Sequence, residues 1–175
     1  VETLDEVCEP YRDYLVFKPG VVIPDVYQMR LLAFSDSWRN QHNFQLVTDC
    51  IRKMVAWAPI PDIQLKAGSQ VVAPGSFALH DLVPEIEKLE GYGWMLWFHR
   101  MELFSRLGVL DEIPALAKQK QWLQNELDAN EGWFTRKLKH GSFAKWGAYS
   151  GLRLEKDWRS AKRRMYDFTF RSGLI

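Results

Sequence analysis

The sequence predicts an all-α protein of about seven helices arranged as antiparallel hairpins, and two observations lead to this prediction. In five segments, apolar residues recur at steps of three and four, which is the spacing of a single helix face. No run of alternating polar and apolar residues has a partner run with which it could pair as a strand. The apolar faces are rich in aromatic residues, since the chain contains 8 Trp, 10 Phe and 6 Tyr. We therefore expect a large aromatic core, an aromatic-lined cavity, or both.

The five helical segments have recognisable ends. In chain order they cover residues 44–58, 82–89, 94–107, 116–127 and 154–168. Pro59 stops the first segment, Asp81 is placed to cap the second, and Gly108 is suited to the left-handed residue that follows the third. Pro114 opens the fourth at a position where a helix tolerates proline. In the fifth, Glu155 is placed to form an ion pair one turn further on.

The connections between these helices are expected to be irregular. At Ile23-Pro24 the proline can open a further helix. Residues 59–84 hold four prolines and form a longer connection than a compact domain normally uses, so this segment could cover a site. Val21-Val22-Ile23 and Val71-Val72 are the only strand candidates, and we expect no sheet.

The 175 residues are expected to form a single domain, because a composition of 47% apolar and 26% charged residues is ordinary for a globular chain. Cys8 and Cys50 do not have the spacing of a disulfide framework or a metal site, which favours a reducing, cytoplasmic compartment. We predict no metal and no cofactor. No apolar run approaches the roughly 20 residues that cross a bilayer, so no transmembrane segment is expected.

One stretch of the chain resembles a known family. Residues 121–133 read QWLQNELDANEGW, and the pairs Gly93-Trp94 and Gly132-Trp133 lie 39 residues apart, a period found in helical-hairpin repeats. This stretch resembles the helix-to-helix element of the α/α-toroid proteins, the terpenoid cyclases and protein prenyltransferases. The resemblance implies that Trp133 stacks under the start of the next helix. Since a complete ring needs roughly 300 residues at about 11–12 residues per helix and longer loops, the chain would form only part of a toroid.

The catalytic equipment of those families is missing from the sequence. The Asp-x-Asp-Asp run of the cyclases does not occur. The prenyltransferases hold zinc with Asp, Cys and His, but Asp49 and Cys50 are adjacent on one predicted helix and point about 100° apart, so they converge poorly on one ion. A non-enzymatic protein is therefore favoured over an enzyme.

If the protein is an enzyme, His99 and Glu102 are the candidate catalytic residues. They share a helix face at positions i and i+3 and could transfer a proton if a cavity opened beside them. The alternative, which we favour, is that they form the polar edge of an amphipathic helix. Arg30, set among apolar neighbours, could bind a carboxylate or phosphate, although such an arginine more often pairs structurally.

The candidate ligand-binding residues combine these polar groups with aromatic ones. They are Arg30, Trp38, Trp94, Trp97, His99 and Trp146. The tryptophans could line a pocket for a hydrophobic or sugar-like ligand. Core filling is the favoured alternative, because most of the tryptophans lie on regular helical stripes.

The two ends of the chain differ in charge. Residues 134–175 carry a net charge of +8, so the first 133 residues carry −7. A basic end can contact nucleic acid, an anionic membrane or an acidic partner, and it can equally dock on the acidic part of its own chain, which we favour together with a solvated face. Nucleic acid is not an expected partner, because no nucleic-acid-binding motif accompanies the charge.

Together these features predict a non-enzymatic binding or interaction domain with an aromatic-rich concave side and a basic C-terminal helix. Its partner would be a hydrophobic or aromatic-stacking ligand, or another protein. An enzyme on a toroid scaffold that acts on a prenyl-type or saccharide substrate is the alternative. Weak nucleic-acid binding through the basic segment is a third possibility.

Overall fold

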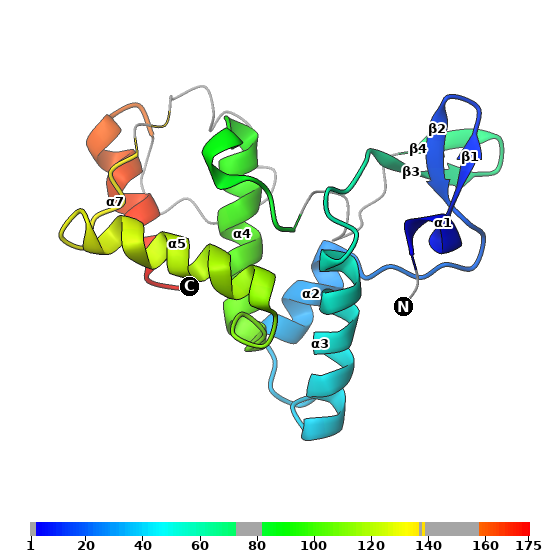
Figure 1. Cartoon of the computed structure of the whole chain (residues 1–175), viewed down its shortest axis with the longest axis horizontal. Helices are drawn as coiled ribbons and strands as arrows, with labels where there is room; N and C mark the ends of the chain where they lie inside the picture. The colour runs from blue at the N-terminus through cyan, green and yellow to red at the C-terminus, as the bar shows by residue number, and fades with distance from the viewer. Residues whose placement is uncertain (1–2, 73–81, 137, 139–157) are drawn as a thin grey trace. The chain divides into compact units, whose positions relative to one another are not determined.

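The computed structural model describes residues 3–72, 82–136, 138 and 158–175 (Figure 1). The chain divides into two compact units, Val1–Pro84 and Glu85–Ile175. Each unit has its own secondary structure and its own buried core.

The first unit contains a four-stranded mixed sheet. Its strands lie in the order β1 (Cys8–Tyr11), β2 (Tyr14–Phe17), β3 (Ile63–Ala67) and β4 (Gln70–Val72). β1 and β2 form one antiparallel hairpin, and β3 and β4 form another. The two hairpins are joined by a parallel pairing of β2 with β3, in which Leu15 lies opposite Ile63 and Val16 lies opposite Gln64. Val16 and Ile63 are fully buried, so the centre of the sheet contributes to the core of this unit.

The described residues of the first unit also form three helices: α1 (Leu4–Val7), α2 (Val26–Ala33) and α3 (Gln41–Val55). α2 begins with a capping box, because the Asp25 carboxylate accepts from the Gln28 backbone N–H at 2.7 Å and the Gln28 side chain accepts from the Asp25 N–H at 3.0 Å. α3 is capped by Asn40, whose side chain accepts from the Asn43 backbone N–H at 2.9 Å. These caps fix where the two helices start.

The prediction of an all-α chain of helical hairpins is therefore wrong. The strands are only three to five residues long, which is too short for a reliable alternating pattern. The turn between β1 and β2 also lacks the usual hairpin signal, because Arg12 rather than glycine or asparagine adopts the positive φ of 55°. The segment expected to be irregular contains β3 and β4, whereas Val21-Val22-Ile23 forms no strand. Nothing in the described part of the chain indicates a toroid.

Among its described residues, the second unit has helices and turns but no strand. It contains the 3₁₀ turn η2 (Ile86–Lys88) and the helices α4 (Tyr92–Leu107), α5 (Pro114–Asp128) and α7 (Ala161–Ser172). The prediction of helices at 94–107 and 116–127 is confirmed, and Gly108 has the expected left-handed φ of 81°. The segment 82–89 forms only the 3₁₀ turn, with Asp81 outside the described residues. The described residues thus hold six α-helices, one of them only four residues long, where about seven were predicted.

An aromatic cluster forms the core of the second unit. It consists of Trp94, Trp97 and Phe98 from α4, Trp122 from α5, Phe134, and Phe168 from α7. The ring centroids of Phe98 and Phe168 are 4.7 Å apart, and those of Phe98 and Phe134 are 5.1 Å apart. Each such pair adds about 0.5–1.5 kcal/mol beyond the burial of its area. The cluster therefore joins α4 to α5 and α7.

The two Gly-Trp pairs have different structures. Gly93 lies within α4 and Trp94 is buried in the aromatic cluster. Gly132 instead has a left-handed φ of 84° after the end of α5, and Trp133 is 42% exposed. The 39-residue spacing therefore does not correspond to a repeated structural unit.

Candidate functional site

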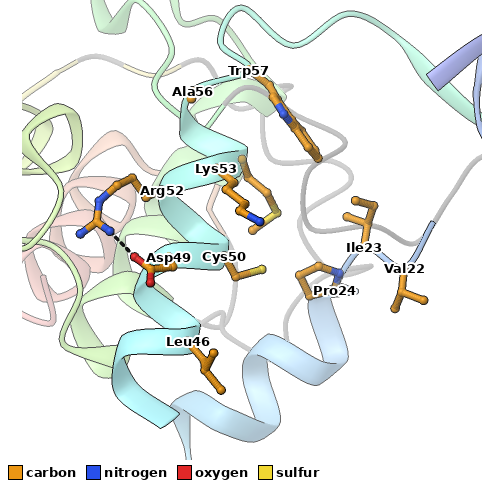
Figure 2. A pocket seen from close by; sticks show the side chains of 11 residues that line it. Val22, Ile23, Pro24, Leu46, Asp49, Cys50, Arg52, Lys53, Ala56 and Trp57 are labelled. Carbon is orange, nitrogen blue, oxygen red and sulfur yellow. Dashed lines mark hydrogen bonds and ion pairs between the residues drawn. The ribbon is translucent and has the colours of Figure 1, made fainter. Parts of the chain in front are cut away.

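A pocket with a volume of about 730 Å³ lies in the first unit. One wall is α3 together with Ala56 and Trp57 at its end, and the other is the extended segment before α2 (Figure 2). The residues that line it are Val22, Ile23, Pro24, Leu46, Asp49, Cys50, Arg52, Lys53, Met54, Ala56 and Trp57. Most of these side chains are apolar, as in pockets that bind small molecules.

The helical period of α3 explains why it forms a wall. Leu46, Cys50, Lys53 and Trp57 follow one another at steps of three or four residues, so they lie along one side. The other wall is extended because Pro24 disfavours helix at the residue before it, and because the capping residue Asp25 delays the start of α2. The pocket thus follows from where two helices begin and end.

The charged side chains of the pocket differ in their roles. The Arg52 guanidinium forms an ion pair with the Asp49 carboxylate, which also accepts from the Gln45 side chain at 3.0 Å. Figure 2 shows Arg52 directed away from the opposite wall and Lys53 directed towards it. Lys53 brings a second cation to a lining that has one carboxylate, Asp49.

Cys50 directs its sulfur into the same space, towards Ile23 and Pro24 (Figure 2). Burial raises the pKa of the Cys50 thiol, and the charge of Lys53 offsets part of this effect. The residues that line the pocket include no histidine, and the one carboxylate among them is held by Arg52. The arrangement therefore provides a neutral thiol and a cation beside apolar walls.

The mouth of the pocket is bordered by exposed apolar side chains. Val22 is 85% exposed and Leu46 is 56% exposed, while Trp57 is buried. Apolar surface of this kind loses contact with water when a ligand covers it, at roughly 25 cal/mol per Å². A ligand that extends from Trp57 to the mouth would contact the buried indole and would also cover the exposed apolar side chains of Val22 and Leu46.

The residues that the sequence suggested for ligand binding lie elsewhere. Trp94 and Trp97 are buried in the aromatic cluster of the second unit, where the Trp97 N–H donates to the Gln119 side chain at 2.6 Å. In the first unit, Arg30 is half-buried on α2, and Trp38 donates to the Leu32 carbonyl at 2.8 Å. Trp146 lies outside the described residues. Of these residues, Trp94 and Trp97 lie side by side, with ring centroids 5.9 Å apart.

His99 and Glu102, the candidate catalytic pair, are both buried on α4. The Glu102 carboxylate accepts from Arg106 Nε at 2.9 Å, and its second oxygen lies 3.6 Å from Arg171 Nη1 of α7. Arg171 also lies 3.7 Å from Asp167, which accepts from the Trp158 indole N–H at 2.5 Å. Glu102 is thus part of an ion-pair network that links α4 to α7.

Basic residues from the C-terminal part of the chain also dock on earlier acidic residues, as predicted. Arg136 forms two hydrogen bonds of 2.9 Å with Glu87 and lies 4.9 Å from the ring centroid of Trp122. Arg171 pairs with Glu102 in the network above. Part of the +8 charge of residues 134–175 is therefore paired with carboxylates within the second unit.

The sequence did not single out the pocket, although one signal for it was present. On α3, Ile51 and Met54 are buried in the core. Leu46, Cys50 and Trp57 follow a neighbouring line along the helix and its end, so the apolar surface of α3 is wider than the part that packs in the core. An apolar arc wider than the core requires can indicate a second contact surface. In the described part of the chain, no group of three His, Cys, Asp or Glu side chains could hold a metal ion. No helix there has both the length and the apolar character needed to cross a membrane.

Comparison of the chain with protein families, with curated proteins and with solved structures finds no match. The resemblance of residues 121–133 to the α/α toroids accordingly stays a prediction.

Proposed function

We propose that the protein is a non-enzymatic binding protein, and that the pocket of the first unit takes an apolar small molecule with an anionic end group. The single observation that carries this proposal is the combination of apolar walls with the cation of Lys53 in a pocket of about 730 Å³. That volume lies within the range of about 300–1,000 Å³ that is typical of small-molecule sites.

The two parts of the ligand follow from the two kinds of lining. The apolar part would lie against Ile23, Pro24 and Trp57, where it removes apolar surface from water. The anionic part would lie at Lys53, because this side chain lines the pocket and is directed towards the opposite wall (Figure 2). Both cysteines are free thiols, which supports a cytoplasmic location as part of this proposal.

Decanoate and 1-decanol test the proposal, since they share an alkyl chain and differ in charge. We expect decanoate to bind the whole protein more tightly than decanol, as measured by titration calorimetry. Lys53→Gln should weaken decanoate by about fivefold to tenfold and leave decanol unchanged, because only the anion contacts the ammonium. Lys118→Gln, at an exposed site on α5, is the matched control for charge and should change neither ligand.

A second pair of variants tests the location. Leu46→Arg places a long charged side chain at the mouth and should abolish binding of both ligands. Leu31→Arg makes the same change at an exposed position of α2 that does not line the pocket, and it should bind as the unaltered protein does. Failure of both ligands to bind, or equal effects of the two arginine variants, would contradict the proposal. Equal binding of decanoate and decanol would contradict its anionic part.

A further inference from the structure

α7 has two different faces. Its buried residues are Asp167, Phe168, Arg171 and Ser172, which pack within the second unit. On the opposite side, Lys162, Arg163, Tyr166 and Phe170 lie within an arc of about 100° at 3.6 residues per turn. All four of these side chains are exposed. We call them, together with Trp133, the cationic aromatic face.

Trp133 extends this face beyond the helix. Its ring centroid lies 5.7 Å from that of Tyr166 at an interplanar angle of 41°. Trp133 is 42% exposed and Phe170 is 52% exposed, in contrast to the buried rings of the aromatic cluster in the same unit. Three aromatic side chains thus gather on one exposed surface, a placement that frequently marks a contact site.

The charge of the face is positive. The Lys162 ammonium lies 5.5 Å from the ring centroid of Tyr166, and Arg163 is exposed beside it. Lysine is charged at neutral pH, and a hydrogen bond with Tyr166 raises the pKa of Lys162 further. Asp167 is the only acidic residue of α7, and it is buried in contact with Trp158 and Arg171. The face therefore complements an anionic surface.

We propose that the cationic aromatic face docks on an anionic lipid surface. Trp133 and Tyr166 would lie at the level of the headgroups, which suits rings that have an apolar body and a polar tip. Phe170, which has no polar group, would reach the acyl boundary. Lys162 and Arg163 would contact the lipid phosphates, an attraction that acts on basic residues within a Debye length of the membrane.

Two observations favour a lipid surface over single-stranded nucleic acid. A base stacks on a free ring face, whereas Tyr166 already has Trp133 and the Lys162 ammonium as ring contacts. The apolar edge contributed by Phe170 gains little from a phosphate backbone but is favourable in a bilayer. A lipid surface uses the cations and the apolar ring together.

Flotation with vesicles tests the proposal on the whole protein. We expect binding to vesicles of equimolar phosphatidylserine and phosphatidylcholine and much weaker binding to pure phosphatidylcholine. The double variant Lys162→Glu with Arg163→Glu should lose about tenfold or more in binding, and added salt should weaken binding of the unaltered protein. Lys66→Glu with Lys118→Glu makes an equal change of charge at two exposed positions outside this face and is the control.

The apolar contribution has its own matched pair. Phe170→Ser should weaken binding to the anionic vesicles by about tenfold, whereas Phe34→Ser, at an exposed phenylalanine of the first unit, should not. As a direct readout, brominated lipids should quench tryptophan fluorescence, and Trp133→Phe should remove most of that quenching.

Circular dichroism of each variant checks that it is folded, which exposed positions permit. Absence of binding to the anionic vesicles, or an equal loss in the Phe34 and Phe170 variants, would overturn the proposal. Binding of oligo-dT that falls with the Lys162 and Arg163 variant, without vesicle binding, would assign the face to nucleic acid instead.

Discussion

Trp133 and Tyr166 contact each other with ring centroids 5.7 Å apart while both rings stay partly open to solvent. The resemblance to the toroid proteins implied a Trp133 that stacks beneath the next helix. The contact with Tyr166 of α7 is tilted, with an interplanar angle of 41°, and it leaves a large part of the indole uncovered. The stability that depends on Trp133 should therefore be smaller than for a core tryptophan.

Trp133→Ala is expected to lower the free energy of unfolding by about 1 kcal/mol, since it removes one partly exposed aromatic pair. Trp94→Ala, within the buried cluster, should cost about 3–5 kcal/mol. Urea unfolding of the two variants measures the difference. Equal losses would show that Trp133 supports the core as strongly as Trp94 does.

Arg171→Met should destabilise the second unit strongly. Arg171 lies within 4 Å of both Glu102 and Asp167, and all three side chains are buried. Removing the cation leaves two buried carboxylates with less compensation, at a cost of about 3–5 kcal/mol. Lys118→Met, on the surface of α5, should stay within about 0.5 kcal/mol. If both variants unfold at the same denaturant concentration, the ion-pair network does not hold α7 to α4.

The ion pair of Glu87 with Arg136 should make stability depend on pH in the acid range. Hydrogen bonding from Arg136 lowers the pKa of Glu87 below its ordinary value of 4.5. A carboxyl with a lowered folded pKa adds stability above its unfolded pKa, and loses it as the pH falls through the folded pKa. Thermal melts of the unaltered protein and of Glu87→Gln should therefore converge below pH 4.5. A constant difference at all pH values would contradict this interpretation.

Cys50 should react slowly with iodoacetamide. Because burial raises the pKa of the thiol, its rate of alkylation should keep rising between about pH 7 and pH 10, beyond the range in which free cysteine levels off. Cys8→Ser leaves Cys50 as the single thiol and isolates its rate, which mass spectrometry can follow. Decanoate should slow the reaction if it occupies the pocket. A rate equal to that of free cysteine would show that partial burial does not raise the pKa of the Cys50 thiol.

The sequence predicted helices well where a long stripe coincided with a strong end signal. α4 has both, because its apolar positions continue over four turns and Gly108 ends it. β1 has neither, since it is four residues long, contains Pro10 and leads into a turn at Arg12. Its place in the sheet depends on pairing with β2 and, through β2, on residues far along the chain, and local patterns do not contain that information.

The candidate site was harder to predict than the fold for a similar reason. The aromatic residues of α4 were candidates for lining a pocket. Their helical spacing places them on one face of the helix, and that face is buried in the core. The pocket instead uses Lys53 and Cys50, which are ordinary residues on α3, and becomes visible only once the segment 22–24 lies opposite them. Such a juxtaposition of distant segments is a tertiary property.

The parallel pairing of β2 with β3 also makes a closed loop of the chain that carries the pocket. Leu15 and Ile63 meet in the sheet, so α2 and α3 lie on a segment whose two ends are fixed beside each other. Closing a loop restricts the chain in advance and lowers the conformational entropy that a ligand would otherwise have to remove. Because an isolated two-stranded hairpin is marginal in water, each of the two hairpins depends on this short parallel junction. Loss of the β2–β3 pairing would therefore both destabilise the sheet and release the two ends of the segment that forms the pocket.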